Sequence, residues 1–275
     1  HYYGGIKKYQ WVAMPLAMHG VVAKKDGTLV NIVIGEDPSD PVIGISDLLP
    51  HLSRDQMSKK GSVVIEGEEL NIIIGSKPLN DEEKEPVKAA VLALLKEKYD
   101  IEEEDFISGE IEVVPAGKAR DFGLDRSMVM AYGQDDRVCA YAALRALLDI
   151  ETPDKTAVCV LADKEEIGSM GVTGMQSAAF DAFMSDLCDG QNVPLKACFE
   201  NAFCLSADVT AAYDPSFADV YEKKNAAFVN YGVGICKYTG ARGKSGSSDA
   251  NAETVAYVRA VLDLSLIHIS EPTRH

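Results

Sequence analysis

The N-terminal part of the chain alternates apolar runs with turn residues in a way that predicts mainly β structure. Apolar runs at 20–23 and 28–34 flank Lys24-Lys25-Asp26-Gly27, and Asp-Gly between two apolar runs favours a hairpin. A further strand is predicted over 70–74. Asn80 and the acids at 81–83 are typical of a helix start, and apolar residues at helical spacing continue through 87–98.

The pattern changes after a strand predicted at 111–114. From there, short apolar runs alternate with amphipathic stretches and glycine-bearing loops. The predicted strands cover 157–162, 202–206 and 227–237, and the predicted helices cover 137–148 and 250–264. Such alternation is typical of an α/β fold, so we expect a doubly wound, mostly parallel sheet with helices on both faces.

Composition limits the function classes. The 275 residues are 47% hydrophobic and 25% charged, which is typical of a soluble globular protein. Acids outnumber bases 43 to 27, for a net charge of -16. Nucleic acids and anionic membrane surfaces attract basic proteins, so this balance argues against both as partners. The apolar runs are of core-helix length, too short to span a membrane. Six cysteines without a CxxC pair indicate free thiols in a reducing compartment, and we expect a cytoplasmic protein.

Acidic residues recur where predicted strands end or helices begin. Asp135-Asp136 precedes the helix at 137–148, the run 163–166 (DKEE) follows the strand at 157–162, and Asp208 follows the strand at 202–206. The carboxyl ends of parallel strands share one sheet edge, where converging acids would repel one another unless a cation were bound. Taken singly, an aspartate here also fits a helix N-cap, and adjacent glutamates fit a solvated helix start.

The adjacent glutamates Glu165 and Glu166 lie in a loop that also carries Gly168, Gly171 and Gly174. A metallohydrolase needs one carboxylate bound to metal and another free to take a proton from water. Neighbouring loop residues can point in different directions and divide these tasks. An aspartate can also bridge two ions about 3.5–4 Å apart.

Three stretches together resemble one family. They are 133–144 (GQDDRVCAYAAL), 163–169 (DKEEIGS) and 205–208 (LSAD). In this order and at these separations they are similar to the aspartyl aminopeptidase and vacuolar aminopeptidase I family of zinc metallopeptidases, with the bacterial, clostridial-type members nearest. The resemblance extends over most of residues 1–264. It implies a two-metal aminopeptidase that releases N-terminal residues from peptides.

The resemblance also assigns roles to individual residues. Asp135 is implied to bridge both metals, and the Asp135-Asp136 peptide is implied to be cis. Glu165 is implied as the general base, and Glu166 and Asp208 as terminal ligands of one metal each. The expected ions are two zinc ions per site, with cobalt or manganese as alternatives.

The resemblance further implies how the chain is organised. Residues 1–112 are expected to form an inserted, β-rich domain that makes dimers and a larger homo-oligomer, and residues 113–264 to form the catalytic domain. We interpret 265–275 as a non-native tail. The family's first histidine ligand lies upstream of His1 and its last lies downstream of Leu264. We therefore expect the chain as printed to be truncated at both ends and inactive, and we assign neither His19 nor His51 to the gap.

Two departures from the better-known members concern substrate contacts. Where these members have two histidines after the third acid, this chain has Ala211 and Asp214, and the usual WFDRD run near Trp11 is absent. A preference for acidic N-terminal residues is therefore not predicted.

Two other functions compete with the peptidase. Gly243-Lys244-Ser245 is similar to part of a phosphate-binding loop, but Tyr238 stands where such a loop needs its first glycine. The second alternative is a non-catalytic, metal-free family member that acts in assembly or binding. Against it, Glu165 and all three acidic metal positions are present.

Overall fold

A computed structural model of the chain describes residues 4–80, 84–238 and 249–264. The chain divides into two compact units, each described here by itself. The first unit comprises His1–Gln134 and Val160–Phe203, and the second comprises Asp135–Cys159 and Cys204–His275. The division of the chain at residue 112 stays a prediction.

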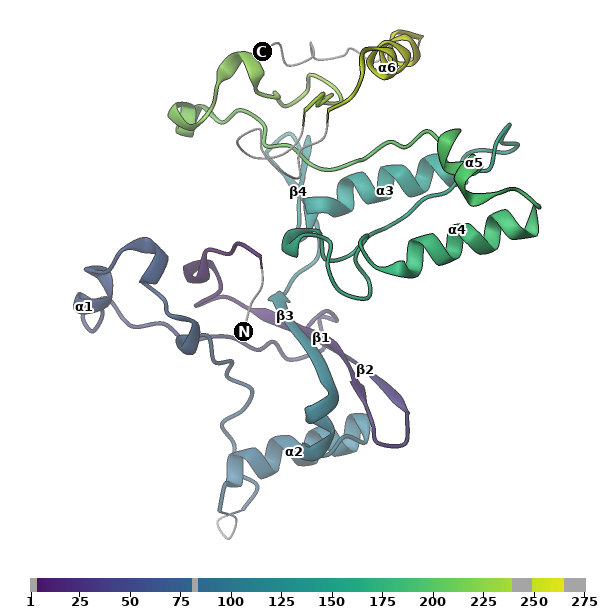
Figure 1. Cartoon of the computed structure of the whole chain (residues 1–275). Helices are drawn as coiled ribbons and strands as arrows, with labels where there is room; N and C mark the ends of the chain where they lie inside the picture. The colour runs from purple at the N-terminus through teal and green to yellow at the C-terminus, as the bar shows by residue number, and fades with distance from the viewer. Residues whose placement is uncertain (1–3, 81–83, 239–248, 265–275) are drawn as a thin grey trace. The chain divides into compact units, whose positions relative to one another are not determined.

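An antiparallel sheet organises the first unit (Figure 1). Its strands are β1 (Leu16–Ala23), β2 (Leu29–Ile34) and β3 (Gly109–Pro115), in the order β2-β1-β3. The predicted Asp-Gly hairpin is confirmed between β1 and β2. The Asp26 carboxylate accepts a hydrogen bond from the Thr28 amide at 2.9 Å, and Gly27 takes a φ of +87° that glycine adopts without a steric cost.

The long connection from β2 to β3 returns to the sheet through helix α2 (Pro86–Tyr99), as predicted for 87–98. The helix ends at Asp100, whose left-handed conformation (φ 54°) stops it, and a 3-10 helix, η4 (Glu103–Ser108), leads into β3. The core of the first unit forms here from Val22, Ile32 and Ile101, which are at most 1% exposed. Burying these side chains ties the strands to the end of α2.

The first unit also contains short elements and one longer helix. These are η1 (Lys8–Gln10), α1 (Arg54–Met57), η2 (Gly61–Val63), η3 (Gly67–Glu69), β4 (Arg120–Phe122), β5 (Met128–Met130), η5 (Glu165–Ile167), α4 (Ala178–Gly190) and α5 (Leu195–Glu200). The Ser177 hydroxyl caps α4 by accepting from the Ala179 amide. Phe180 of α4 stacks on Phe199 of α5 at 6.3 Å between ring centroids, so these two helices pack together.

The second unit contains two longer helices, α3 (Gln134–Leu148, whose first residue belongs to the first unit) and α6 (Ala252–Leu264), with the short η6 (Pro215–Val220) and η7 (Lys223–Asn225) between them. An aromatic cluster packs in this unit. Tyr213 lies 5.6 Å from Tyr221 and 5.3 Å from Phe228, centroid to centroid. All six cysteines of the chain are free thiols.

The mixed α/β class is confirmed, but several predicted strands are not formed. In the described ranges, 157–162 and 202–206 carry no paired strand, and 70–74 and 227–237 make isolated bridges at Ile73 and Ala227. The five named strands all pair antiparallel. An apolar run predicts burial, whereas a strand also needs a neighbour in register. Val158 and Leu205 lack such a neighbour and stay 40% and 71% exposed.

Some predicted features lie outside the described residues. They are the acids at 81–83, the 243–245 run, and the tail 265–275 with His268. Within the described part of the chain, helices are too short or too polar to cross a lipid bilayer.

Candidate metal centre

The loop with the paired glutamates belongs to the first unit. Glu165 and Glu166 open the single turn η5, which starts after Lys164 in a left-handed conformation (φ 64°) and ends at Gly168 with φ 82°. The Gly168 amide donates to the Glu165 carbonyl at 2.8 Å, and the Ser169 amide donates to the Lys164 carbonyl at 2.8 Å. The two glutamates therefore lie in a tight turn, not along a continuous helix face.

Asp163 joins the start of this loop to its end. One of its carboxylate oxygens accepts from the Lys164 amide and the other from the Thr173 hydroxyl, both at 2.8 Å. The Thr173 hydroxyl and the Lys164 amide hold the pKa of Asp163 below its usual range, because both stabilise the ionised form. Asp163, predicted as an acid at a strand end, thus stabilises the loop through its own hydrogen bonds.

Glycines allow the loop to close. A Cβ on Gly174 would lie 2.1 Å from the Ser169 carbonyl oxygen, a separation that no real side chain could keep. A Cβ on Gly4 would lie 3.2 Å from Cβ of Glu166, so the N-terminal segment runs directly past this glutamate. Because both positions lack a side chain, the backbone can lie close to Ser169 at Gly174 and close to Glu166 at Gly4.

Three aspartates converge in the second unit. Asp135, Asp136 and Asp208 each offer a carboxylate oxygen, and these atoms all lie within 4.8 Å of one another. Asp135 and Asp136 stand at the start of α3 in non-helical conformations, joined by a cis peptide bond. The cis bond agrees with the family resemblance. Asp208 accepts a hydrogen bond from the Val209 amide at 2.6 Å through Oδ1.

The electrostatics of this aspartate cluster favour a positive ligand. Burial, followed by the charges of Asp208 and Asp136, raises the pKa of Asp135. Oδ1 of Asp136 is buried without a hydrogen-bond partner within the described residues. Burial and the neighbouring Asp136 carboxylate raise the pKa of the Cys139 thiol to about 11, so this thiol stays protonated and brings no further negative charge.

This donor set fits a divalent cation. Converging carboxylate oxygens suit hard ions, and a bound ion would satisfy the buried Asp136 oxygen and relieve the repulsion at Asp135. The structure brings together the predicted ligands Asp135 and Asp208. It adds Asp136, which was predicted as their neighbour and not as a ligand. Glu165 and Glu166 lie in the first unit, and their predicted roles stay predictions.

Two residues at the departures from the family pattern, Asp214 and Trp11, make structural contacts. Asp214 caps η6, since its carboxylate accepts from the Ser216 amide at 2.8 Å. The Trp11 indole donates to the Val113 carbonyl at 3.3 Å, and its ring meets Tyr132 edge to face at 6.5 Å. Both side chains therefore support local structure.

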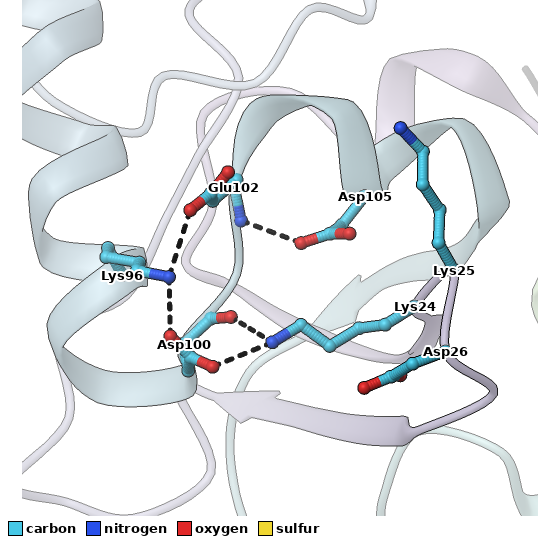
Figure 2. A pocket seen from close by; sticks show the side chains of 7 residues that line it. All are labelled: Lys24, Lys25, Asp26, Lys96, Asp100, Glu102 and Asp105. Atoms are coloured by element: carbon cyan, nitrogen blue, oxygen red, sulfur yellow. Dashed lines mark hydrogen bonds and ion pairs between the residues drawn. The ribbon is translucent and has the colours of Figure 1, made fainter.

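A charged pocket lies elsewhere in the first unit (Figure 2). It is lined by Lys24, Lys25, Asp26, Lys96, Asp100, Glu102 and Asp105. Lys96 pairs with Asp100 at 2.6 Å and with Glu102 at 3.0 Å, and Lys24 pairs with Asp100 at 2.8 Å. Because these opposite charges neutralise one another within the pocket, they serve as ties between the hairpin and α2.

The converging carboxylates thus define a candidate divalent-cation site, typical of a metalloprotein. The chain belongs to the family described as aminopeptidase I zinc metalloprotease (M18), which it matches over residues 1–270. It is 57% identical over 267 residues to the curated "Probable M18 family aminopeptidase 1" of Clostridium acetobutylicum. The aligned region covers 95% of this chain and 57% of that relative.

Solved structures agree with this assignment. The crystal structure of aminopeptidase I from Clostridium acetobutylicum matches with a TM-score of 0.90 at 54% identity, over 98% of this chain and 59% of that one. The dodecamer structure of mApe1 from S. cerevisiae matches with a TM-score of 0.68 at 21% identity, over 98% of this chain and 60% of that one, and shows the fold alone. The chain thus spans less than two thirds of the length of these relatives.

Proposed function

We propose that this chain is part of a metal-dependent aminopeptidase that releases N-terminal residues from peptides. The observation that carries the proposal is the convergence of Asp135, Asp136 and Asp208 within 4.8 Å in a chain of a zinc metalloprotease family. The non-catalytic alternative is not favoured, because a relative more than half identical to this chain is named as an aminopeptidase.

The residues that would hold the metal follow from the family motifs. Asp135 would be shared between two divalent ions, with Asp208 and Glu166 as a further ligand of one ion each. Zinc is proposed from the family description, with cobalt and manganese as alternatives. Bound ions of this kind supply a water of lowered pKa and polarise a carbonyl.

Glu165 is proposed as the general base. It would take a proton from the attacking water and pass it to the leaving amine as the peptide bond breaks. Its position beside Glu166 in the turn η5 supports this division of tasks, because consecutive residues of a tight turn can point in different directions. A glutamate free of metal keeps its basic oxygen available for the proton.

The decisive experiment replaces Glu165 with Gln in a form of the protein that spans the full length of the relatives. We expect loss of aminopeptidase turnover with normal metal content, because Gln keeps the shape and removes the base. Glu151→Gln, at an exposed position outside the motifs, is the matched control and should keep full turnover. Retained activity, or lost metal, in the Glu165→Gln protein would show that the two glutamates are assigned the wrong way round.

The organisation of the complete protein is a second part of the proposal. Residues 1–112 would form the β-rich inserted domain that makes dimers and a larger homo-oligomer, and 113–264 would form part of a doubly wound catalytic domain. The hairpin β1–β2 supports the β-rich character of residues 1–112. The yeast relative is described as a dodecamer, which supports a homo-oligomer. Deleting 1–112 and measuring particle mass by light scattering tests it, since an unchanged assembly would place the contact elsewhere. The cytoplasm stays the proposed location.

A further inference from the structure

The glutamate loop, residues 164–174, is held by hydrogen bonds and hardly at all by apolar packing. Its apolar side chains face solvent, with Ile167, Met170 and Val172 exposed by 38%, 55% and 87%. A loop that buries so little apolar surface gains little from the hydrophobic effect. Polar contacts must therefore set where its two glutamates stand.

One carboxylate makes the contacts that close the loop. Asp163 accepts from the backbone amide of Lys164, where the loop begins, and from the hydroxyl of Thr173, where it ends, both at 2.8 Å. The backbones meet at the same place, because Asp163 and Gly174 form a parallel bridge and the Asp163 amide donates to the Thr173 carbonyl at 3.4 Å. Asp163 thus fixes both ends of a segment whose apolar side chains are largely exposed.

Further contacts carry this constraint to the glutamates. The Lys164 carbonyl accepts from the Ser169 amide and the Glu165 carbonyl accepts from the Gly168 amide, both at 2.8 Å. The Gln176 side chain donates to the Gly168 carbonyl at 2.6 Å. A change at the Asp163–Thr173 contact would therefore reach Glu165 through the backbone of Lys164 and the two hydrogen bonds that close the turn.

We propose that Asp163 and Thr173 are positioning residues of the aminopeptidase site, whose side-chain hydrogen bond sets where the loop presents Glu165 and Glu166. The proposal rests on the proposed function, since it assumes that these glutamates act on the substrate and the metal. It adds a requirement that the metal ligands and the base do not by themselves impose. The loop must be closed by a hydroxyl at 173.

The test compares Thr173→Val, which removes the hydroxyl and keeps the shape, with Thr173→Ser, which keeps the hydroxyl. Thr152→Val, at an exposed threonine outside the loop, is the matched control. The first readout is hydrogen exchange of the 164–176 amides in the 275-residue chain. We expect exchange about ten-fold faster in Thr173→Val, as befits the loss of a hydrogen bond to a charged acceptor, and near-normal exchange in the other two.

The second readout is steady-state kinetics of the same variants in the full-length form at saturating zinc. We expect kcat to fall about ten-fold in Thr173→Val with KM nearly unchanged, and Thr173→Ser to restore it. Asp163→Asn provides a second variant, since one amide oxygen cannot replace two carboxylate oxygens in both hydrogen bonds. It should act in the same direction as Thr173→Val.

The outcomes separate this proposal from the proposed function. A loosened loop with unchanged kcat, or a Thr173→Ser protein as slow as Thr173→Val, would overturn the positioning role while leaving the aminopeptidase intact. Unchanged exchange in Thr173→Val would overturn it as well. Absence of turnover in the unaltered full-length protein would overturn the proposed function, and the positioning role with it.

Discussion

The Lys24 ammonium donates to two oxygens of Asp100, the backbone carbonyl at 2.5 Å and the carboxylate at 2.8 Å. This contact joins the β1–β2 hairpin to the residue that ends α2, across 76 positions of sequence (Figure 2). Lys96, one turn earlier in α2, approaches the other carboxylate oxygen at 2.6 Å. Asp100 therefore fixes the end of a helix and the turn of a hairpin at once.

This arrangement predicts an acid-sensitive part of the stability. Hydrogen bonds from Lys24 and Lys96 lower the pKa of Asp100 from 3.8 to about 2. Because the folded-state pKa is depressed, the stabilisation is complete above the ordinary pKa and is lost as the pH falls through about 2. Asp100→Asn, which tolerates the left-handed conformation, should lower the unfolding midpoint at pH 7 and have little effect near pH 2. An equal deficit at both pH values in denaturant melts would contradict this.

Replacing Ile101 with Ala should destabilise the first unit. Ile101 is 0% exposed and packs with Val22 and Ile32. A buried Ile→Ala change costs about 2–5 kcal/mol, the lost transfer free energy plus the cavity. Ile107→Ala is the matched control, because Ile107 is 88% exposed and its loss should stay within about 0.5 kcal/mol. Equal losses in urea melts would show that Ile101 is not a core residue.

The aspartate cluster should destabilise the metal-free chain at neutral pH. The pKa of Asp135 is raised by burial and by the charges of Asp208 and Asp136, so its ionised form is less favourable folded than unfolded. This penalty develops as the pH rises above the ordinary carboxyl pKa and disappears in acid. In chelator, Asp208→Asn should therefore raise the melting temperature at pH 7 and not at pH 3.

The amide oxygen of Asn can still accept from the Val209 amide, so Asp208→Asn removes mainly a charge. Asp154→Asn, an exposed position of the same unit, controls for net charge. The same rise in both variants would trace the effect to overall charge and not to the cluster.

The 275 residues alone should bind zinc weakly and show no peptidase turnover. Among the described residues, the candidate site offers only carboxylates, and zinc in catalytic sites favours imidazole among its ligands. Titration with zinc, cobalt and manganese, followed by assays on a panel of aminoacyl substrates, tests this. Turnover that chelator abolishes and Asp135→Asn removes would contradict it.

Local patterns predicted the elements whose cause is local. The Asp26-Gly27 turn correctly predicted the hairpin. Helical spacing predicted α2 and α6 with bounds close to the observed ones. The strands predicted at 157–162 and 202–206 are not formed, because an apolar run indicates burial and does not specify the neighbouring strand that pairing needs.

The acidic residues of the candidate site were also predicted only in part. Their motifs pointed to Asp135 and Asp208, which the structure brings together with Asp136. The participation of Asp136 depends on the geometry of the backbone at the start of α3. The contact from Asp163 to Thr173 spans ten positions, so no periodic pattern in the sequence predicts it. An aspartate directly before a glycine-rich loop was the one sequence signal for such a contact.

The discontinuity of both units has a consequence for synthesis on the ribosome. The first unit needs residues 160–203 to be complete, and the second needs residues from 204 onward to join 135–159. Because chains emerge from the N-terminus at about 5–20 residues per second, α3 must wait for several seconds before its own unit exists. During that interval α3 has been synthesised, but the residues from 204 onward that complete its unit have not. Codons that slow translation after residue 203 would therefore lengthen the time during which α3 has no complete unit to join.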